Sequence, residues 1–120
     1  MQKCRDAGIL ATMRAICILL LSGLSLWAAA QPSVAPSPLR QHELIRLVRQ
    51  DCGACHGMTL KGGLGSPLLP ESLRETPPAS LVATVLHGRP GTPMPAWKSI
   101  LGEHEVEWIV AQLIQGFPQE

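Results

Sequence analysis

The chain has 120 residues and a formal net charge of +1, from ten Lys and Arg residues and nine Asp and Glu residues. This length allows one compact domain, and the near balance of charges excludes the strongly basic surface typical of nucleic-acid-binding proteins. Aromatic residues are scarce, with three Trp, one Phe and no Tyr. A domain this small buries too little surface to be more than marginally stable, so we expect a cofactor or a cross-link to supplement its core.

The first thirty residues have the pattern of a secretory signal peptide. A basic start leads into an uncharged, mainly apolar run over residues 15–27, and three alanines precede Gln31. This order predicts cleavage after Ala30 and export of the protein. The alternative, an uncleaved membrane anchor, requires about 20 apolar residues, and this run is shorter. Cleavage would also remove Cys4 and Cys17 and leave Cys52 and Cys55 as the only cysteines.

A Pro- and Ser-rich stretch, residues 31–38, is predicted to be an extended linker before a domain that spans residues 39–120. The domain opens with apolar side chains at helical spacing, namely Leu44, Ile45, Leu47 and Val48. This pattern predicts a helix over residues 39–51 that runs directly into Cys52.

Two loops rich in glycine and proline flank a second predicted helix. Residues 57–70 hold four glycines and two prolines, and residues 89–97 hold three prolines, so neither stretch suits a regular element. Between them, Thr76 as a cap, Pro77 at the first helical position and a following apolar stripe predict a helix that ends at Gly88.

The last predicted helix begins in a cluster of acidic residues, which suit the positive end of a helix dipole. Its expected buried face consists of Val106, Ile109, Val110, Leu113 and Ile114, and Gly116 followed by Pro118 ends it. No sustained period-two alternation occurs in the sequence. We therefore predict an all-α fold in which three main helices and long loops wrap around a bound group.

The chemistry of the chain is concentrated in QDCGACHGMTL, residues 50–60. If the first helix continues through Cys52, then Cys52, Cys55 and His56 share one face, because positions i, i+3 and i+4 are neighbours on a helix. Two thiols and an imidazole in this arrangement suit a porphyrin, and C-x-x-C-H is the signature of covalent haem attachment. We therefore predict one haem c, bound through Cys52 and Cys55, with His56 as an axial ligand of the iron.

Three alternatives to a haem stay open for these residues. A structural zinc site needs four ligands, usually with a second close pair, whereas the remaining histidines are scattered singly. A thioredoxin-like redox pair should follow a strand, and no strand is predicted there. A disulfide agrees with export, but it gives His56 and the rigid loops no role.

Met94 is the preferred candidate for the sixth position of the iron. Pro93 and Pro95 flank it and stiffen its loop, so its sulfur can be held at little further entropic cost. A His/Met pair raises the redox potential and leaves no open site for a substrate.

The competing candidates for the sixth position have simpler roles. His87 is the main competitor because it ends the second predicted helix, although a histidine there more often interacts with the helix dipole. The same role suits His42 and His104. Met58 follows His56 too closely to reach across the ring, and we expect it to pack.

These features resemble a class I cytochrome c. The motif C-G-A-C-H follows an N-terminal helix, Met94 lies in the sequence PMPAW, and the C-terminal helix contains Trp108. The resemblance covers residues 39–117. It implies that Pro67 stands where the family has a proline whose carbonyl orients the proximal imidazole. We also expect Trp97 to pack near the edge of the ring, with ordinary core packing as the alternative.

More narrowly, DCGACHGMTLKGGLG, HGRPGTPMPAW and EWIVAQLIQG resemble the small monohaem cytochromes of the c55X type, which are encoded beside the haem d1 nitrite reductase of denitrifying bacteria. This resemblance implies a soluble periplasmic electron carrier, not an enzyme, whose partner is that reductase or its maturation machinery. An alternative role is a redox or assembly factor in the maturation or insertion of haem d1. A third hypothesis, a peroxidase-like haem enzyme with an open site, requires that Met94 does not bind the iron.

Overall fold

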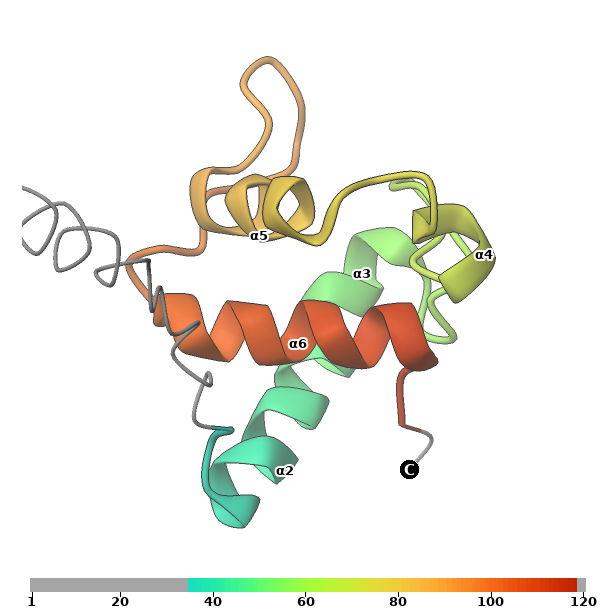
Figure 1. Ribbon diagram of the computed structural model, residues 1–120. Coiled ribbons are helices and arrows are strands. Elements are labelled where there is room, and N and C mark those ends of the chain that lie inside the picture. Colours follow the sequence, from blue (N-terminus) through green and yellow to red (C-terminus); the bar gives the residue numbers. More distant parts are fainter. Residues whose placement is uncertain (1–34, 119–120) are drawn as a thin grey trace, which may run out of the picture. The chain divides into compact units, whose positions relative to one another are not determined.

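The computed structural model describes residues 35–118, which form the helical segments shown in Figure 1. In chain order these are α2 (Pro38–Leu47), η1 (Val48–Cys52), α3 (Gly53–His56), α4 (Pro70–Leu73), α5 (Pro78–His87) and α6 (Glu103–Gln115). No strand occurs among these residues, and the prediction of an all-α fold with three main helices is confirmed. The predicted signal peptide and the linker residues 31–34 lie outside the described residues.

The first main helix begins one residue earlier than predicted. Ser37 is its cap, and the hydroxyl oxygen of Ser37 accepts a hydrogen bond from the backbone N–H of Arg40 at 3.4 Å. Pro38 follows at the first helical position, where its missing N–H costs nothing and its fixed φ suits a helix. The capping hydroxyl and the proline together define this start.

A π turn, η1, joins α2 to α3 without a break in the helix. The backbone N–H of Gly53 donates to the carbonyl of Val48, five residues earlier, and Cys52 keeps helical angles of φ −67° and ψ −39°. The expectation that the first helix continues through Cys52 is therefore confirmed. The wider turn was not predicted; such turns are rare in helices and frequent at functional sites.

The second main helix, α5, ends as predicted but begins differently. Its cap is Pro77, with φ −56° and ψ 137°, and Pro78 holds the first helical position. The assignment of Thr76 as the cap is wrong because the ring of Pro77 already fixes an extended backbone before the helix. Gly88, at φ +69°, ends α5 as expected.

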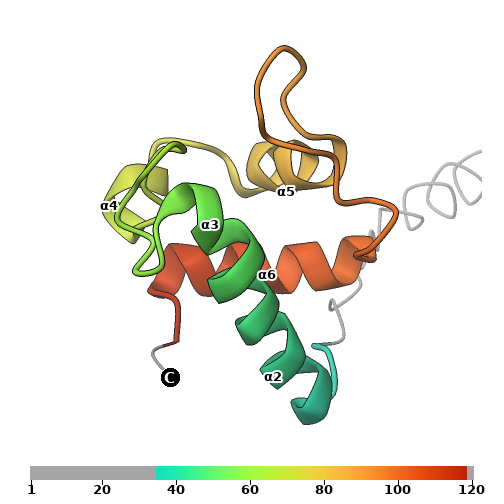
Figure 2. The ribbon, with the colours of Figure 1, turned by 180° about the vertical axis from the view of Figure 1, so that it is seen from behind.

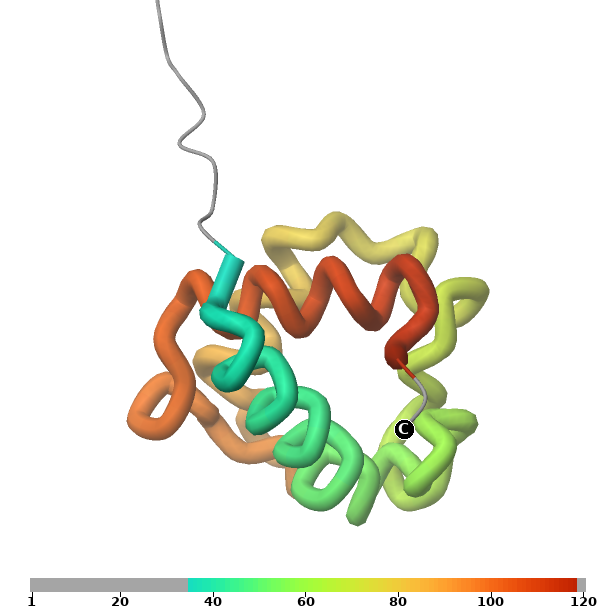
Figure 3. The backbone as a smooth tube through the Cα atoms, turned by 90° about the horizontal axis from the view of Figure 1, so that it is seen from below, coloured from blue at the N-terminus to red at the C-terminus, as the bar shows by residue number. Residues whose placement is uncertain are grey.

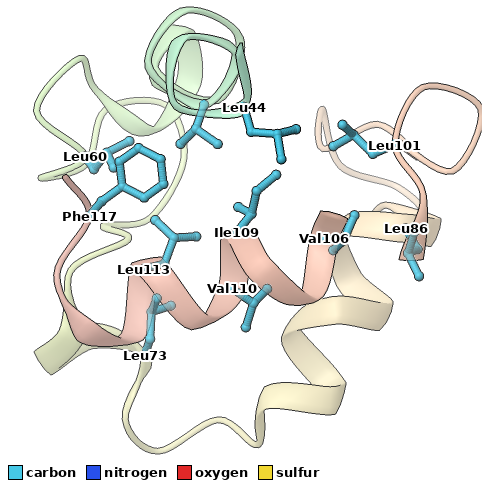
Figure 4. Close-up of a cluster of buried hydrophobic side chains, with 11 residues drawn as sticks. Leu44, Leu60, Leu73, Leu86, Leu101, Val106, Ile109, Val110, Leu113 and Phe117 are labelled. Atoms are coloured by element: carbon cyan, nitrogen blue, oxygen red, sulfur yellow. The ribbon is translucent and has the colours of Figure 1, made fainter. Parts of the chain in front are cut away.

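The core is centred on α6, which crosses the first helix (Figures 1 and 3). Val106, Ile109, Val110 and Leu113 are buried, as predicted, and Ile114 is partly buried. Figure 4 shows Ile109 pointing toward Leu44 of α2, whereas Val110 points to the other side of α6. Because α5 packs along that other side, α6 is covered by helices on two sides.

An ion pair that the sequence analysis missed joins the starts of α2 and α6. Arg40 Nε donates to Glu105 Oε1 at 2.5 Å, and Glu105 Oε2 accepts from the backbone N–H of Gly102 at 2.8 Å. These hydrogen bonds, that from Arg40 above all, hold the pKa of the Glu105 carboxyl below its usual value although the residue is only 9% exposed. The partners lie 65 residues apart, so no local spacing indicates the pair.

Candidate functional site

The two cysteines and the histidine lie within one continuous helical segment. Cys52 is the last residue of η1, and Cys55 and His56 belong to α3. Their spacing places the three side chains on neighbouring positions of one face. Both thiols are free, and all three side chains are partly exposed. The helix thus presents two sulfurs and an imidazole on its surface.

The electrostatic surroundings of Cys52 argue against a reactive thiolate. Burial, with a smaller contribution from the Asp51 carboxylate, raises the pKa of the Cys52 thiol to about 11. The attacking cysteine of a thioredoxin-like pair needs the opposite, a lowered pKa. No strand precedes the motif among the described residues either. Both observations disfavour a dithiol redox pair.

His56 is held by a hydrogen bond from its own ring. His56 Nδ1 lies 2.6 Å from the carbonyl oxygen of Ser66. Since a carbonyl oxygen can only accept, Nδ1 carries a proton, and in the neutral ring Nε2 is then the nitrogen with the lone pair. This is the tautomer in which a histidine binds a metal through Nε2, with the second nitrogen oriented by a backbone carbonyl.

The oxygen that orients His56 belongs to Ser66, and the expectation that Pro67 supplies it is wrong. Pro67 instead restricts the residue before it to extended backbone, which fixes the direction of the Ser66 carbonyl. The ring of Pro67 also lies against Gly62, whose hypothetical Cβ would be 3.2 Å from Pro67 Cγ. A contact between Pro67 and a haem stays a prediction.

The loop after α3 folds back against the end of that helix. Gly62 and Gly65 donate their backbone N–H groups to the carbonyls of His56 and Cys55, each at 2.8 Å. Gly65 also passes so close to the imidazole that a Cβ there would lie 2.7 Å from His56 Nδ1. The loop therefore fixes both the backbone and the ring of His56.

Met94 lies in a loop that is closed at its base. After α5 the chain rises on the side of α5 that faces away from α6 and then returns to the start of α6 (Figures 1 and 2). The backbone N–H of Arg89 donates to the Met94 carbonyl at 3.1 Å, and the N–H of Met94 donates to Thr92 Oγ1 at 3.3 Å. Gly88 packs against the Met94 backbone, where a Cβ would lie 2.7 Å from the carbonyl oxygen. Met94 itself is partly exposed.

The other residues that the sequence suggested as haem contacts or iron ligands lie in the core or at the surface. Trp97 is partly buried against the hydrophobic core, and its backbone N–H donates to the carbonyl of Val85 at 3.1 Å. This supports the core-packing alternative, while a contact of Trp97 with a haem stays a prediction. The competing histidines are exposed or partly exposed, namely His42, His87 and His104. Met58 is 61% exposed, so the expectation that it packs is wrong.

Arg49 is a residue that the sequence analysis missed. Its guanidinium donates to the carbonyl of Met58 at 3.2 Å and to that of Pro118 at 2.5 Å, and it lies 5.3 Å from the centre of the Phe117 ring. Arg49 thus ties η1 to the loop after α3 and to the end of the chain. No signal in the sequence could have revealed it, because Pro118 is 69 residues away.

The residues present fit a haem better than the alternatives. Within residues 35–118, no group of three or more His, Cys, Asp and Glu side chains could hold a metal ion, so the zinc hypothesis has no site there. Covalent haem attachment requires two thiols and an imidazole nitrogen, and the chain supplies them in the free thiols of Cys52 and Cys55 and in Nε2 of His56.

None of the helices within residues 35–118 is long and apolar enough to cross a membrane.

Comparisons with known proteins point to c-type cytochromes. Residues 38–113 match the family described as cytochrome C oxidase, cbb3-type, subunit III. Cytochrome c55X of Pseudomonas aeruginosa is 56% identical over 81 residues, which make up 68% of each chain. The solved structure of the c-type cytochrome NirC superposes with a TM-score of 0.67 and 54% identity over 68% of this chain and 95% of that one. Dihydro-heme d1 dehydrogenase of Pseudomonas aeruginosa is 42% identical over 101 residues, 84% of this chain but 19% of that protein.

Proposed function

This chain belongs to the cytochrome c55X family of c-type cytochromes and has the cytochrome c fold, and from this membership we propose that it transfers single electrons through one covalently bound haem. When bound, the haem iron supplies one-electron redox chemistry. The protein supplies attachment, orientation and the surroundings that set the potential.

Cys52 and Cys55 are the attachment residues, and His56 is the proximal ligand. The observation that carries this assignment is the hydrogen bond between His56 Nδ1 and the Ser66 carbonyl, because it makes Nε2 the metal-binding nitrogen of the neutral ring and orients the ring. Gly65 restrains the same ring sterically. The His56 ring is thus held by a hydrogen bond and by a close backbone contact. A ligand held in this way moves little when the iron changes its oxidation state, and a small structural change favours fast electron transfer.

Met94 is the sixth ligand in this proposal. Its loop is held shut by the bond from Arg89 N–H to the Met94 carbonyl and by the close packing of Gly88. A thioether ligand favours the reduced iron and raises the potential. If His56 and Met94 both hold the iron, no site would be open for a substrate, and the protein would act as a carrier and not as an enzyme.

The proposed site of action is the periplasm, with residues 1–30 as the cleaved signal peptide, residues 31–38 as the linker and residues 39–120 as the monohaem domain. The proposed process is nitrite respiration, with the haem d1 nitrite reductase as the partner. Family membership and the similarity to NirC support this assignment.

A second candidate function is a redox or assembly factor in haem d1 maturation. The similarity over 101 residues to a dihydro-heme d1 dehydrogenase favours it. Deletion of the gene separates the two roles. Loss of a carrier leaves a reductase that contains mature haem d1 but is short of electrons, whereas loss of an assembly factor leaves a reductase without mature haem d1.

An optical redox titration of the exported, haem-loaded protein tests the ligand assignment. We expect a high potential together with the near-infrared band of sulfur bound to ferric haem, and both should be lost in Met94→Ala. The control is Met58→Ala, which should retain both because Met58 is largely exposed beside α3. A low potential without the band, or ready binding of carbon monoxide by the reduced protein, would contradict Met94 ligation and favour the open-site enzyme.

A further inference from the structure

A groove of about 530 Å³ lies between α5 and α6, apart from the candidate haem site. Its walls are mainly small or branched apolar side chains, Ala79, Val82 and Ala83 from α5 and Val110, Ala111 and Ile114 from α6. None of the proposed haem ligands lines the groove.

The floor of the groove is shared with the core, since Leu86 and Val110 belong to both, and three alanines open it to solvent, namely Ala79, Ala83 and Ala111. On α5, Ala79 and Ala83 lie four residues apart on one face, whereas Leu81 and Val85 pack against the core from another. Ala83 is exposed, and Ala111 is partly exposed. The alanines create the hollow, because larger side chains at these positions would fill the space between the helices.

The rim of the groove carries two carboxylates that have no ion-pair partner among the described residues. Glu103 and Glu107 line the groove and are exposed, and neither takes part in any ion pair within residues 35–118. This distinguishes them from Glu105, which is paired with Arg40. Two carboxylates four residues apart on a helix repel each other. The groove lining includes no Lys or Arg, and His87 is its one basic side chain. A cation brought by a ligand would relieve this repulsion.

The charge and shape together define the ligand class. An anionic small molecule, including a tetrapyrrole with carboxylate side chains, would be repelled by Glu103 and Glu107. We propose that the α5–α6 groove docks an amphipathic helical segment of a partner protein, with small apolar side chains against Ala83 and Ala111 and with Lys or Arg beside the two glutamates. An apolar groove that takes the apolar face of a helix is a recurring mode of recognition.

Docking in this groove leaves the candidate electron-transfer site free. The groove is lined by residues of α5 and α6, whereas the haem-binding residues come from η1, α3 and the loop of residues 88–102. A partner held in the groove would raise the effective concentration of the cytochrome for a redox reaction at the other site. The inference does not depend on the electron-transfer proposal, because it uses none of those residues.

The test uses the haem-loaded, exported protein and two synthetic helical peptides with the same alanine- and leucine-based apolar face, one flanked by Lys and one by Glu. Binding is measured by titration calorimetry and located by NMR. We expect only the Lys peptide to bind, with shifted amide signals at Ala83 and Ala111. Glu107→Lys should weaken binding roughly tenfold, since the ion pair of Glu107 is lost and a repulsion is added.

The matched control is Glu71→Lys on α4, which makes the same charge change at an exposed residue outside the groove and should leave the affinity unchanged. A second variant, Ala83→Arg, fills the groove from an exposed position and should abolish binding while circular dichroism and the haem spectrum stay unchanged. Equal binding of both peptides, shifts confined to other residues, or equal affinity in Glu71→Lys and Glu107→Lys would overturn the proposal. Self-association that Ala83→Arg removes would overturn it as well, because a second copy would then be the occupant.

Discussion

Replacing Gly65 by alanine tests how tightly the loop restrains His56. A Cβ at this position would lie 2.7 Å from His56 Nδ1 and 2.8 Å from Cε1, whereas ordinary contact begins at 3.4 Å. The ring or the loop would therefore have to move by about 0.7 Å. The φ angle of Gly65 is not positive, so alanine can adopt this backbone. Any cost must come from the close approach alone.

Two contributions set the size of the effect. Overpacking a tight site costs about 1–3 kcal/mol. Displacement of the ring also weakens its 2.6 Å hydrogen bond to the Ser66 carbonyl, and such a bond contributes about 0.5–1.5 kcal/mol. We therefore expect Gly65→Ala to lower the free energy of unfolding by about 2–4 kcal/mol. Guanidinium unfolding followed by far-UV circular dichroism measures this change.

Gly53→Ala is the matched control, because Gly53 lies in the same motif with helical φ of −62° and a Cβ there would have no neighbour closer than 3.4 Å. This variant should be as stable as the parent, or more stable by up to about 1 kcal/mol, because alanine favours a helix. Equal stability of Gly65→Ala and Gly53→Ala would refute the reasoning, since the loop would then yield to a methyl group without strain.

Three further predictions concern the scaffold. Glu105→Gln should lower the free energy of unfolding by about 1–2 kcal/mol at pH 7, because the charge-assisted bond from partly exposed Arg40 is weakened. Because the folded-state pKa of Glu105 is lowered, the stability difference between parent and variant is present above the unfolded pKa of about 4.3 and is lost as the pH falls through the folded value. Urea unfolding at pH 7 and pH 3 measures this difference. A difference that persists undiminished at pH 3 would contradict the prediction. Arg49→Ala should cost about 2–3 kcal/mol in thermal unfolding, because two carbonyls and an aromatic ring lose their cationic partner; a loss below about 0.5 kcal/mol, the usual range for surface substitutions, would contradict it. Leu44→Ala, at a side chain with 0% exposure, should cost about 2–5 kcal/mol in urea unfolding, whereas Leu39→Ala, at 73% exposure, should stay within about 0.5 kcal/mol; equal losses would contradict the assignment of the core.

The helices and the motif were predictable because their signals are local. Apolar spacing predicted α2 and α6, and Gly88 marked the end of α5 because a glycine most easily adopts its positive φ. The motif at Cys52 to His56 predicted the residues that share one helix face. Each of these inferences needs only neighbouring residues and a known helical period.

The parts that were missed depend on contacts distant in sequence or on backbone detail. The Arg40–Glu105 pair and the contact of Arg49 with Pro118 join residues more than sixty positions apart, which no spacing rule reports. The π turn, Val48–Cys52, widens the hydrogen bonding of an otherwise continuous helix, and composition does not determine that choice. The carbonyl that orients His56 was assigned to Pro67, one residue too late, because family likeness identifies the proline but not which neighbouring oxygen faces the ring.

Because the Met94 loop is closed by its own hydrogen bonds, it can be exchanged as a whole for the corresponding loop of a related protein. Within the described part of the chain, the hydrogen bonds of residues 89–94 all join members of the loop, and the segment that follows is fastened to α5 through bonds from Trp97 and Lys98. Residues 88–98 could therefore be exchanged between homologues as a cassette, with α5 and α6 left untouched. If Met94 is the sixth ligand, as proposed, a library of such chimaeras would vary that ligand and its surroundings while the residues around His56 stay constant, and would give a series of proteins with graded redox potentials.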